Sequence, residues 1–585
     1  MSDKVLELKG LLSQDDPSRF IATTWDTLNM QRQNKMTEWL ELRNYIFATD
    51  TSTTTNNKLP WKNSTTIPKL CQIRDNLHSN YISALFPNDN WLSWQAYTDD
   101  ASKHSVAKTI QGYMENKCRE SHFRTEISKL IYDYIDYGNA FSTVSYEQKY
   151  KQMADGTIVP DYIGPRLHRI SPLDIVFNGL ADSFSNSYKI IRSVKTLGEV
   201  SKMAQDEPEN SFWQGALDRR LKIQQLLGTG YRYEDFQKAC GYTADGFGNM
   251  QEYFQSNNME ILEFYGDYYD NDSGELHTNV VITIVDRSFK VREEPIPTWF
   301  GGAPIWHVGW RFRQDNLWAM GPLDNLVGMQ YRLDHLENAK ADAMDLSIQP
   351  PLKIIGEVEA FTWGPGAEIH LDEGGDVGPV VSFLNSIAIA DSQIRDLEDR
   401  MELYAGAPRE AMGIRSPGEK TAFEVQSLEN AAGRIFQEKT SNFEIELLEP
   451  SLNGMLETAR RNMDGVDTIR VLDTDLNVQE FSLITKEDIT ANGVLRPVGA
   501  RHFAKRAQDL QNLIGVFNSP IGQLVAPHTS GIGVTEFIND VVGLTAYKIF
   551  RPNVAVAEQQ QTASLAQTGQ EDLAVQASQP VPAGV

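Results

Sequence analysis

The chain has 585 residues and a formal net charge of −25, with 41% hydrophobic and 23% charged residues. This composition is typical of a globular protein of several domains. The chain has no apolar run of roughly 18 residues and no apolar signal-peptide core, so we expect neither a membrane protein nor a secreted one. The acidic excess argues against a protein that wraps DNA, because such proteins neutralise phosphates with Lys and Arg.

The N-terminal part of the chain is expected to be mainly helical. Apolar residues at helical spacing predict helices over residues 5–48, with a break at Asp16-Pro17, and over 68–86 and 105–137. Residues 51–57 are polar and of low complexity, which indicates an exposed loop between the first two helical regions.

Strands are expected next. Residues 141–153 and 157–163 flank Ala154-Asp155-Gly156, which is a hairpin signal, and residues 260–292 have the alternation and turns of a β-meander. Between these strand regions, residues 196–227 are predicted to form polar, exposed helices.

The central segment, residues 321–463, has an unusual order of elements. One helix is predicted over 321–347, where Pro350-Pro351 stops it, and a second over 388–404. Three short strands are expected in the insert between them: Leu352–Ile355, Glu368–Leu371 and Val380–Leu384. A Gly/Pro-rich loop, 405–420, then precedes a long helix from about 421 to 463, which Pro450 should kink.

The C-terminal region is predicted less sharply. Residues 468–472 and 479–483 indicate two strands, and residues 498–517 and 533–550 indicate two helices. Beyond Pro552 the chain is rich in Gln, Ala, Ser and Pro and contains no Lys or Arg, so we expect this tail to be disordered on its own.

One stretch approaches a nucleotide-binding motif. Residues 413–421 resemble a P-loop, but Glu419 is inserted before Lys420, and a charged helix rather than a buried strand precedes the stretch. An NTP-dependent nucleic-acid motor is therefore kept as an alternative, and it predicts nucleotide binding that is lost in Lys420→Ala. We find no motif for a metal, a cofactor or a catalytic centre, and the three cysteines are isolated from one another, so we predict a protein without enzymatic activity.

The local charge balance changes at the loop. Acidic residues outnumber basic ones in both central helices and in the insert, whereas residues 405–420 contain two acids and three bases, Arg409, Arg415 and Lys420. One hypothesis is that these bases contact DNA phosphates weakly and without sequence preference; the alternative is chance, because the charges are few.

The order of elements and several short phrases resemble the portal proteins of tailed bacteriophages, closest in character to those of short-tailed phages. The phrases are Leu317-Trp318-Ala319-Met320-Gly321-Pro322-Leu323-Asp324, Gln349-Pro350-Pro351-Leu352, Gly406-Ala407-Pro408, Lys420-Thr421-Ala422, and Ile170-Ser171-Pro172-Leu173-Asp174-Ile175-Val176-Phe177. The resemblance covers roughly residues 30–520, and it lies in the order of the phrases rather than in any one of them.

This resemblance implies a helix-rich α+β fold and a division of the chain into named regions. The regions are an N-terminal wing of helices and a β-meander (1–320), stem helix 1 (321–347), the clip (348–387), stem helix 2 (388–404), the tunnel loop (405–420), a long kinked helix returning to the wing (421–500), a crown-like helical region (501–552) and a flexible tail (553–585).

The resemblance also implies a function. The chain would form a homo-oligomeric ring, dodecameric in this family, at one capsid vertex of the virion. Double-stranded DNA would pass through the ring during packaging and ejection, without sequence specificity. The clip would bind the terminase large subunit and then the tail adaptor protein, and the wing would meet the major capsid and scaffolding proteins.

Two sets of residues follow as candidate sites, with no cofactor, no metal and no catalytic residue expected. The tunnel-loop DNA contacts would be Arg409, Arg415 and Lys420. The clip interface for adaptor and terminase would be Glu357, Glu359, Trp363, Glu368, Asp372 and Glu373. Another phage ring or tail protein, such as a tube or adaptor, is the remaining alternative; those proteins are usually shorter and lack the helix–insert–helix order.

Overall fold

The computed structural model describes residues 2–47, 63, 65–86, 91–97, 103–228, 250–271, 273–296, 301–348, 352–356, 374–379, 384–406, 435–463, 466–473 and 478–497. As the sequence predicted, the fold is mixed α+β, and its sheets are small and antiparallel. The chain divides into two units. Unit 1 contains residues 1–84 and 117–463, and unit 2 contains 85–116 and 464–585.

Unit 1 begins with helices. These are α1 (Ser2–Leu11), α2 (Asp16–Gln31), α3 (Gln33–Ile46) and α4 (Lys69–Leu85). The predicted break at Asp16-Pro17 is the first turn of α2, where Pro lacks only an N–H that would have no helical partner. The Asp15 side chain caps this end by accepting a hydrogen bond of 3.1 Å from the Ser18 N–H.

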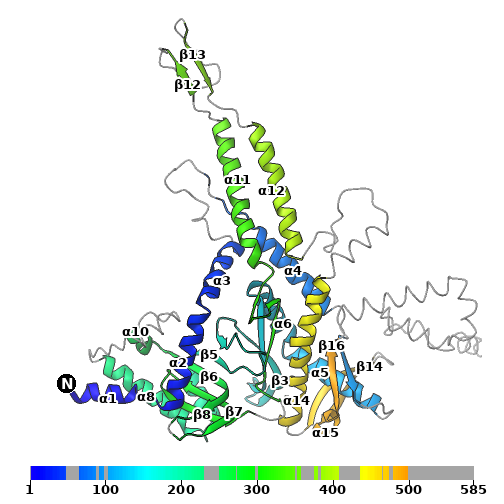
Figure 1. The fold of residues 1–585 in the computed structure, drawn as a ribbon. Helices are drawn as coiled ribbons and strands as arrows, with labels where there is room; N and C mark the ends of the chain where they lie inside the picture. Colours follow the sequence, from blue (N-terminus) through cyan, green and yellow to red (C-terminus); the bar gives the residue numbers. More distant parts are fainter. Residues whose placement is uncertain are drawn as a thin grey trace, which may run out of the picture. The chain divides into compact units, whose positions relative to one another are not determined.

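A five-stranded antiparallel sheet lies between two layers of helices (Figure 1). Its strands, in spatial order, are β4 (Ile175–Phe177), β5 (Lys189–Thr196), β6 (Asn258–Tyr269), β7 (Leu276–Val285) and β8 (Phe289–Pro295). The last three are the predicted β-meander. Because side chains alternate along a strand, Leu262 and Phe264 of β6 pack with α2, whereas Met259 and Ile261 pack on the opposite face.

The helices on that opposite face correct one prediction. Residues 196–227 were expected to be polar and exposed, but they form α7 (Leu197–Asp206) and α8 (Ser211–Gly228), which bury Val200, Trp213 and Leu217 against the sheet. The buried face of these helices was not predicted because its apolar residues are widely spaced among charged ones. The short helix α10 (Met250–Gln255) follows and packs with α1 and α8 through Tyr253 and Phe254.

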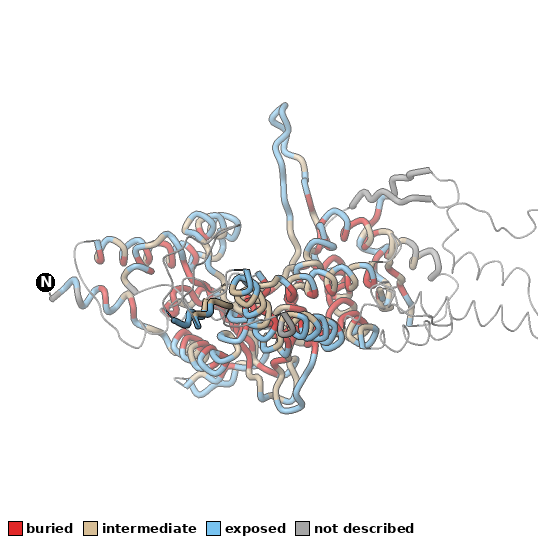
Figure 2. The backbone as a smooth tube through the Cα atoms, turned by 90° about the horizontal axis from the view of Figure 1, so that it is seen from above, coloured by how far each residue is buried: buried red, intermediate tan, exposed pale blue. Residues whose placement is uncertain are grey.

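A three-stranded sheet forms the rest of the core of unit 1. Its order is β3 (Ile158–Ile170), β2 (Asn139–Gln152) and β9 (Ile305–Gly309), and β2–β3 confirms the predicted hairpin. The outer halves of β2 and β3 are exposed, in agreement with the long pale-blue hairpin that projects in Figure 2. The small hairpin of β10 (Arg311–Arg313) and β11 (Asn316–Met320) follows β9.

The helices α6 (Phe123–Asp136) and α14 (Glu449–Asn462) pack against this sheet. The stretch 105–137 is interrupted at His122, which lies in the left-handed region (φ 56°), so that α5 (Lys103–Glu120) and α6 (Phe123–Asp136) are separate. The helix α14 (Glu449–Asn462) lies close to β2, with 2.8 Å between the hydroxyls of Ser142 and Ser451. Near Pro450, where a kink was predicted, a π-helical turn, Glu444–Leu448, ends two residues before the proline, which has no N–H to donate to a helical hydrogen bond.

The helix–insert–helix order predicted for residues 321–404 is confirmed. A 3₁₀ turn, Asp324–Leu326, leads into α11 (Val327–Ile348), and α12 is Leu384–Tyr404. The strand β12 (Leu352–Ile355) was predicted, but its partner β13 is Asp376–Pro379, which was not. Gly378 and Pro379 are weak strand formers, so β13 has no strand-like pattern. Figure 1 shows α11 and α12 side by side, with the β12–β13 pair beyond their ends.

Unit 2 contains two further strand pairs. In one, β1 (Leu92–Ala96) pairs with β16 (Gly493–Pro497). In the other, β14 (Val466–Asp473) pairs with β15 (Val478–Thr485), which confirms the two strands predicted there, and α15 (Lys486–Ile489) follows. Only glycine fits at 493, because a Cβ would lie 2.4 Å from Cζ2 of Trp94. The predicted crown (501–552) and tail (553–585) lie outside the described residues.

None of the helices in the described part of the chain has the length and apolar character that crossing a membrane requires.

Candidate functional site: the α11–α12 hairpin

The two helices of the α11–α12 hairpin contact each other mainly along one side. Leu333 of α11 and Ile394 and Met401 of α12 are buried at helical spacing. Lys340 joins the helices through its ammonium group, which lies 3.1 Å from Asp391 and 2.7 Å from Glu337. The hydrogen bond to Glu337 raises the pKa of Lys340 and so keeps it charged.

The hairpin is acidic. α11 contains four acidic and two basic residues, and α12 contains five acidic and two basic residues, so the pair has a formal charge of −5. Most of these charges are at least partly exposed, among them Asp396 and Arg400, an (i, i+4) pair in which both side chains are 59% exposed. The surface of the hairpin would therefore repel a polyanion more than it would bind one.

Residues 63 and 65–67 are held along one face of α11 by side chains four residues apart. The Ile67 N–H donates to Asp334 (2.9 Å), the Thr65 N–H to Asn338 (2.7 Å) and the Asn63 N–H to Asp342 (2.7 Å). The amide groups of Gln330 and Asn338 donate in return to the carbonyls of Ile67 (2.7 Å) and Thr65 (2.9 Å). We call this arrangement the α11 ladder.

The α11 ladder was not predicted, although the sequence contains the polar pattern from which it is built. Gln330, Asp334, Asn338 and Asp342 form a polar stripe with a spacing of four, on a face that would ordinarily be solvated. The partner backbone lies more than 260 positions away in the chain, and nothing local indicates that it would cover the stripe.

The base of the hairpin is fixed to unit 1 by buried contacts. Lys69 of α4 and Glu402 of α12 are 2.6 Å apart, and each side chain is only 5% exposed. Gly138, at the end of α6, has φ of 69°, and a Cβ there would lie 2.3 Å from the Gly321 nitrogen. Backbone therefore meets backbone at this junction, which requires glycine.

Away from its base, the hairpin exposes large apolar side chains. Ile348 is 71% exposed and Ile389 is 61% exposed, in the halves of α11 and α12 next to the β12–β13 pair. Among the described residues, other large apolar side chains are exposed along the hairpin and at its base: Tyr331, Met344, Ile354, Ile355, Leu403 and Tyr404. A two-helix hairpin ending in a two-stranded pair buries little apolar surface on its own, so this element needs further packing partners to be rigid.

The residues that sequence analysis proposed as sites lie outside the described residues. They are Arg409, Arg415 and Lys420 of the loop, and Glu357, Glu359, Trp363, Glu368, Asp372 and Glu373 of the insert. The described structure shows only the elements beside them: the insert connects β12 to β13, and the loop follows α12 after Gly406. Both site assignments remain predictions.

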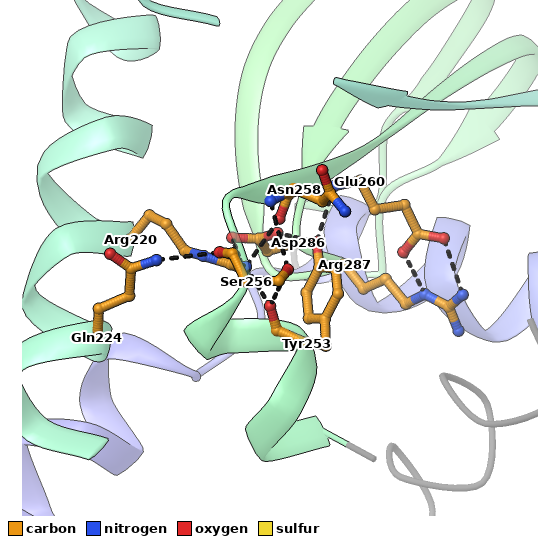
Figure 3. Close-up of polar contacts among 8 residues, drawn as sticks. All are labelled: Arg220, Gln224, Tyr253, Ser256, Asn258, Glu260, Asp286 and Arg287. Atoms are coloured by element: carbon orange, nitrogen blue, oxygen red, sulfur yellow. Dashed lines mark hydrogen bonds and ion pairs between the residues drawn. The ribbon is translucent and has the colours of Figure 1, made fainter. Parts of the chain in front are cut away.

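A second polar cluster lies at one end of the five-stranded sheet (Figure 3). The Arg287 guanidinium binds Glu260 through two hydrogen bonds (2.7 and 2.9 Å) and Asp26 at 2.8 Å. Arg220, fully buried, donates to the carbonyls of Tyr253 (2.5 Å) and Asn258 (2.8 Å) and lies 3.1 Å from Asp286.

This sheet-end cluster has a structural role. The Tyr253 hydroxyl donates to Asp286 and accepts the Glu260 N–H at 2.7 Å, so the charged groups are bonded to one another. Asp286 and Arg287 both have positive φ, 50° and 54°, in the tight turn between β7 and β8, and the cluster holds that turn. Within the described ranges, no group of three or more His, Cys, Asp or Glu side chains could hold a metal ion.

Comparison of the chain with models of known protein families gives no match, and a search among curated proteins finds no similar sequence.

Proposed function

We propose that this chain is a portal-type subunit, which forms a ring at one capsid vertex of a tailed phage and gives DNA a passage during packaging and ejection. The observation that carries the proposal is the α11–α12 hairpin, an acidic pair of helices that has a small β pair between its ends and leaves large apolar side chains uncovered. In a ring, each hairpin would pack its apolar residues against the next copy, and the acidic faces would line a channel from which DNA phosphates are repelled.

The finer assignments in this proposal follow the resemblance stated from the sequence. The hairpin helices are the stem, the β12–β13 pair belongs to the clip, and residues 1–320 form the wing. The homo-oligomeric ring is dodecameric, its clip binds the terminase large subunit and then the tail adaptor, and its wing contacts the capsid and scaffolding proteins. The portal performs no chemistry on DNA, because the packaging ATPase is a separate chain.

Ring formation is tested with purified protein by negative-stain microscopy and by a mass measurement that counts subunits. In the variant Ile389→Lys/Leu403→Lys, two exposed apolar side chains become charged, so we expect rings to dissociate into monomers while the far-ultraviolet circular dichroism is unchanged. Leu180→Lys is the matched control, because Leu180 is 77% exposed and lies outside the hairpin. A wild-type protein that remains monomeric, or that forms closed particles without an axial channel, would contradict the proposal.

The predicted loop is tested separately. Replacing Arg409, Arg415 and Lys420 with Ala should leave the subunit count unchanged and should reduce DNA packaging or retention, because weak phosphate contacts are lost. If the variant instead fails to form rings, the loop is an assembly element and its contact with DNA is unsupported.

A further inference from the structure

A cavity of about 420 Å³ lies in unit 1 between α3, α4, α6 and the residues that follow β3. Its lining combines aromatic rings, aliphatic side chains and charged groups, a mixture typical of sites for small molecules. The charged residues that line it are Arg43, Arg74, Lys129, Asp133, Asp136 and Arg169. We call it the α3–α6 cavity. It is distant in sequence from the loop and insert that the proposed function uses.

The two carboxylates in the wall are already occupied. Arg74 donates two hydrogen bonds to Asp136, at 2.6 and 2.7 Å, and its guanidinium carbon lies 4.0 Å from the centre of the Tyr132 ring. Arg169 binds both oxygens of Asp133, one of them at 2.6 Å. Both pairs are bidentate, the strong geometry for Arg and carboxylate, so these carboxylates are poor ligands for an incoming cation.

Two more cations line the cavity. Lys129 is held by Glu126 at 2.6 Å, whereas the side chain of Arg43 has neither an ion pair nor a hydrogen bond among the described residues. Arg43 is exposed and lines the same cavity. Asp133, Asp136 and Glu126 are each paired with a cation, and Arg74 also lies 3.6 Å from Asp75. Arg43 is therefore the lining cation without a carboxylate partner among the described residues, and so the one placed to attract an anion.

The rest of the lining is apolar and partly aromatic. Leu42 and Ile46 of α3 line it, together with Phe47, which follows α3, and with Tyr137 and Leu173. Phe47 is 56% exposed, and the Arg74 guanidinium carbon lies 5.6 Å from the centre of its ring. A ligand that fits this lining needs a flat apolar body and one negatively charged group.

We propose that the α3–α6 cavity binds a small organic carboxylate whose flat apolar body packs against Phe47 and Tyr137 and whose carboxylate pairs with Arg43. A monovalent carboxylate matches the single charge of Arg43, whereas a phosphate dianion would leave one negative charge without a partner. The site goes beyond the proposed ring function and does not depend on it.

The probes are phenylacetate, its neutral isostere phenylacetamide, and phenyl phosphate, titrated into the full-length protein and followed by ligand-observed NMR. A ligand of this size binds in about the millimolar range. We expect phenylacetate to bind roughly tenfold more tightly than phenylacetamide, because a hydrogen-bonded charge contributes about one order of magnitude. Phenyl phosphate should bind more weakly than phenylacetate.

Two variants separate the two parts of the site. Arg43→Gln should lower the affinity for phenylacetate about tenfold and leave that for phenylacetamide unchanged. Phe47→Ser should weaken both probes equally. Arg119→Gln is the control, since Arg119 is exposed and lies outside the cavity lining. Circular dichroism checks that each variant is folded.

The proposal is overturned if phenylacetate and phenylacetamide bind equally, if Arg43→Gln has the same effect as Arg119→Gln, or if no probe binds at concentrations on the order of 10 mM.

Discussion

The sheet-end cluster and the α11–α12 hairpin contain the same kinds of charged residues in opposite settings. At the sheet end, Arg287 and Glu260 are 4% and 0% exposed and bind each other through two hydrogen bonds. On the hairpin, Arg400 and Asp396 form a pair at 2.9 Å in which both side chains are mostly in solvent. The first region pairs its charged groups within one chain, whereas the second leaves both charges and apolar side chains uncovered.

This difference indicates where the stability of the single chain resides. A buried ion pair is strongly destabilising to break, because the remaining charge is left in a medium of low dielectric constant, while an exposed pair contributes little. The sheet end should therefore respond to mutation in the isolated subunit. The hairpin should respond mainly when copies of the chain meet.

The largest effect is expected for Arg287→Met. The substitution leaves the Glu260 carboxylate fully buried without its bidentate partner, so we expect the free energy of unfolding to fall by about 3–5 kcal/mol. Denaturant unfolding of the purified chain measures the change. The double variant Arg287→Met/Glu260→Leu should regain part of the loss, because the buried Glu260 charge is removed together with its partner. If the single variant lowers the free energy of unfolding by less than about 1 kcal/mol, this buried ion pair does not stabilise the isolated chain as expected.

A second effect concerns the stability of the folded chain at acid pH. His307 is half-buried, stacks on Phe141 with 4.5 Å between ring centres, and contacts Asn139 at 3.0 Å. Burial, reinforced by Lys189, lowers the pKa of His307 to about 3. The unfolded chain therefore binds one more proton than the folded chain between about pH 6.5 and pH 3, and stability contributed by the neutral ring is lost as the pH falls through that window.

The expected loss from this one group is about 4 kcal/mol at the acid end of the window. Unfolding midpoints measured between pH 7 and pH 4 should fall more steeply for the wild type than for His307→Gln, which keeps a hydrogen-bond donor but does not titrate. Equal slopes for the two proteins would mean that His307 is not held neutral.

Helices and strands could be predicted where the residues that determine them are close together in the sequence. The two hairpin helices depend on apolar spacing and on Pro350-Pro351, all within a few turns, and both were predicted. The strand β13 was missed because Gly378 and Pro379 carry no strand preference, and its position is set by pairing with β12. The buried faces of α7 and α8 were missed because the sheet they cover lies elsewhere in the chain.

The polar contacts could not be predicted at all. Arg287 meets Asp26 across 261 positions, and Asp334 meets the Ile67 backbone across 267. Side chains of this type on a helix or turn are usually solvated, so a sequence pattern favours exposure until the tertiary partner is known. The same limit applied to Arg43 and Arg169 of the α3–α6 cavity, which come from a helix and a strand far apart in the sequence.

A smaller effect is expected in the α11 ladder. Asn338→Ala removes one acceptor and one donor that hold Thr65, so we expect a loss of about 1 kcal/mol. Limited proteolysis near residue 63 should also become faster, since residues 63 and 65–67 are held less firmly. Asn462→Ala serves as a control, because the Asn462 amide donates to the Thr458 carbonyl of its own helix, at 2.9 Å.

The smallest effect on the isolated chain is expected for Arg400→Met, which repeats the chemistry of Arg287→Met at an exposed pair. Solvent replaces the lost partner of Asp396, so the free energy of unfolding should change by less than about 0.5 kcal/mol. The comparison is most informative when both variants are measured at several protein concentrations. A cost for Arg400→Met that grows with concentration would show that this pair is covered when chains associate, whereas the cost for Arg287→Met should stay constant, because its partners all lie within one chain.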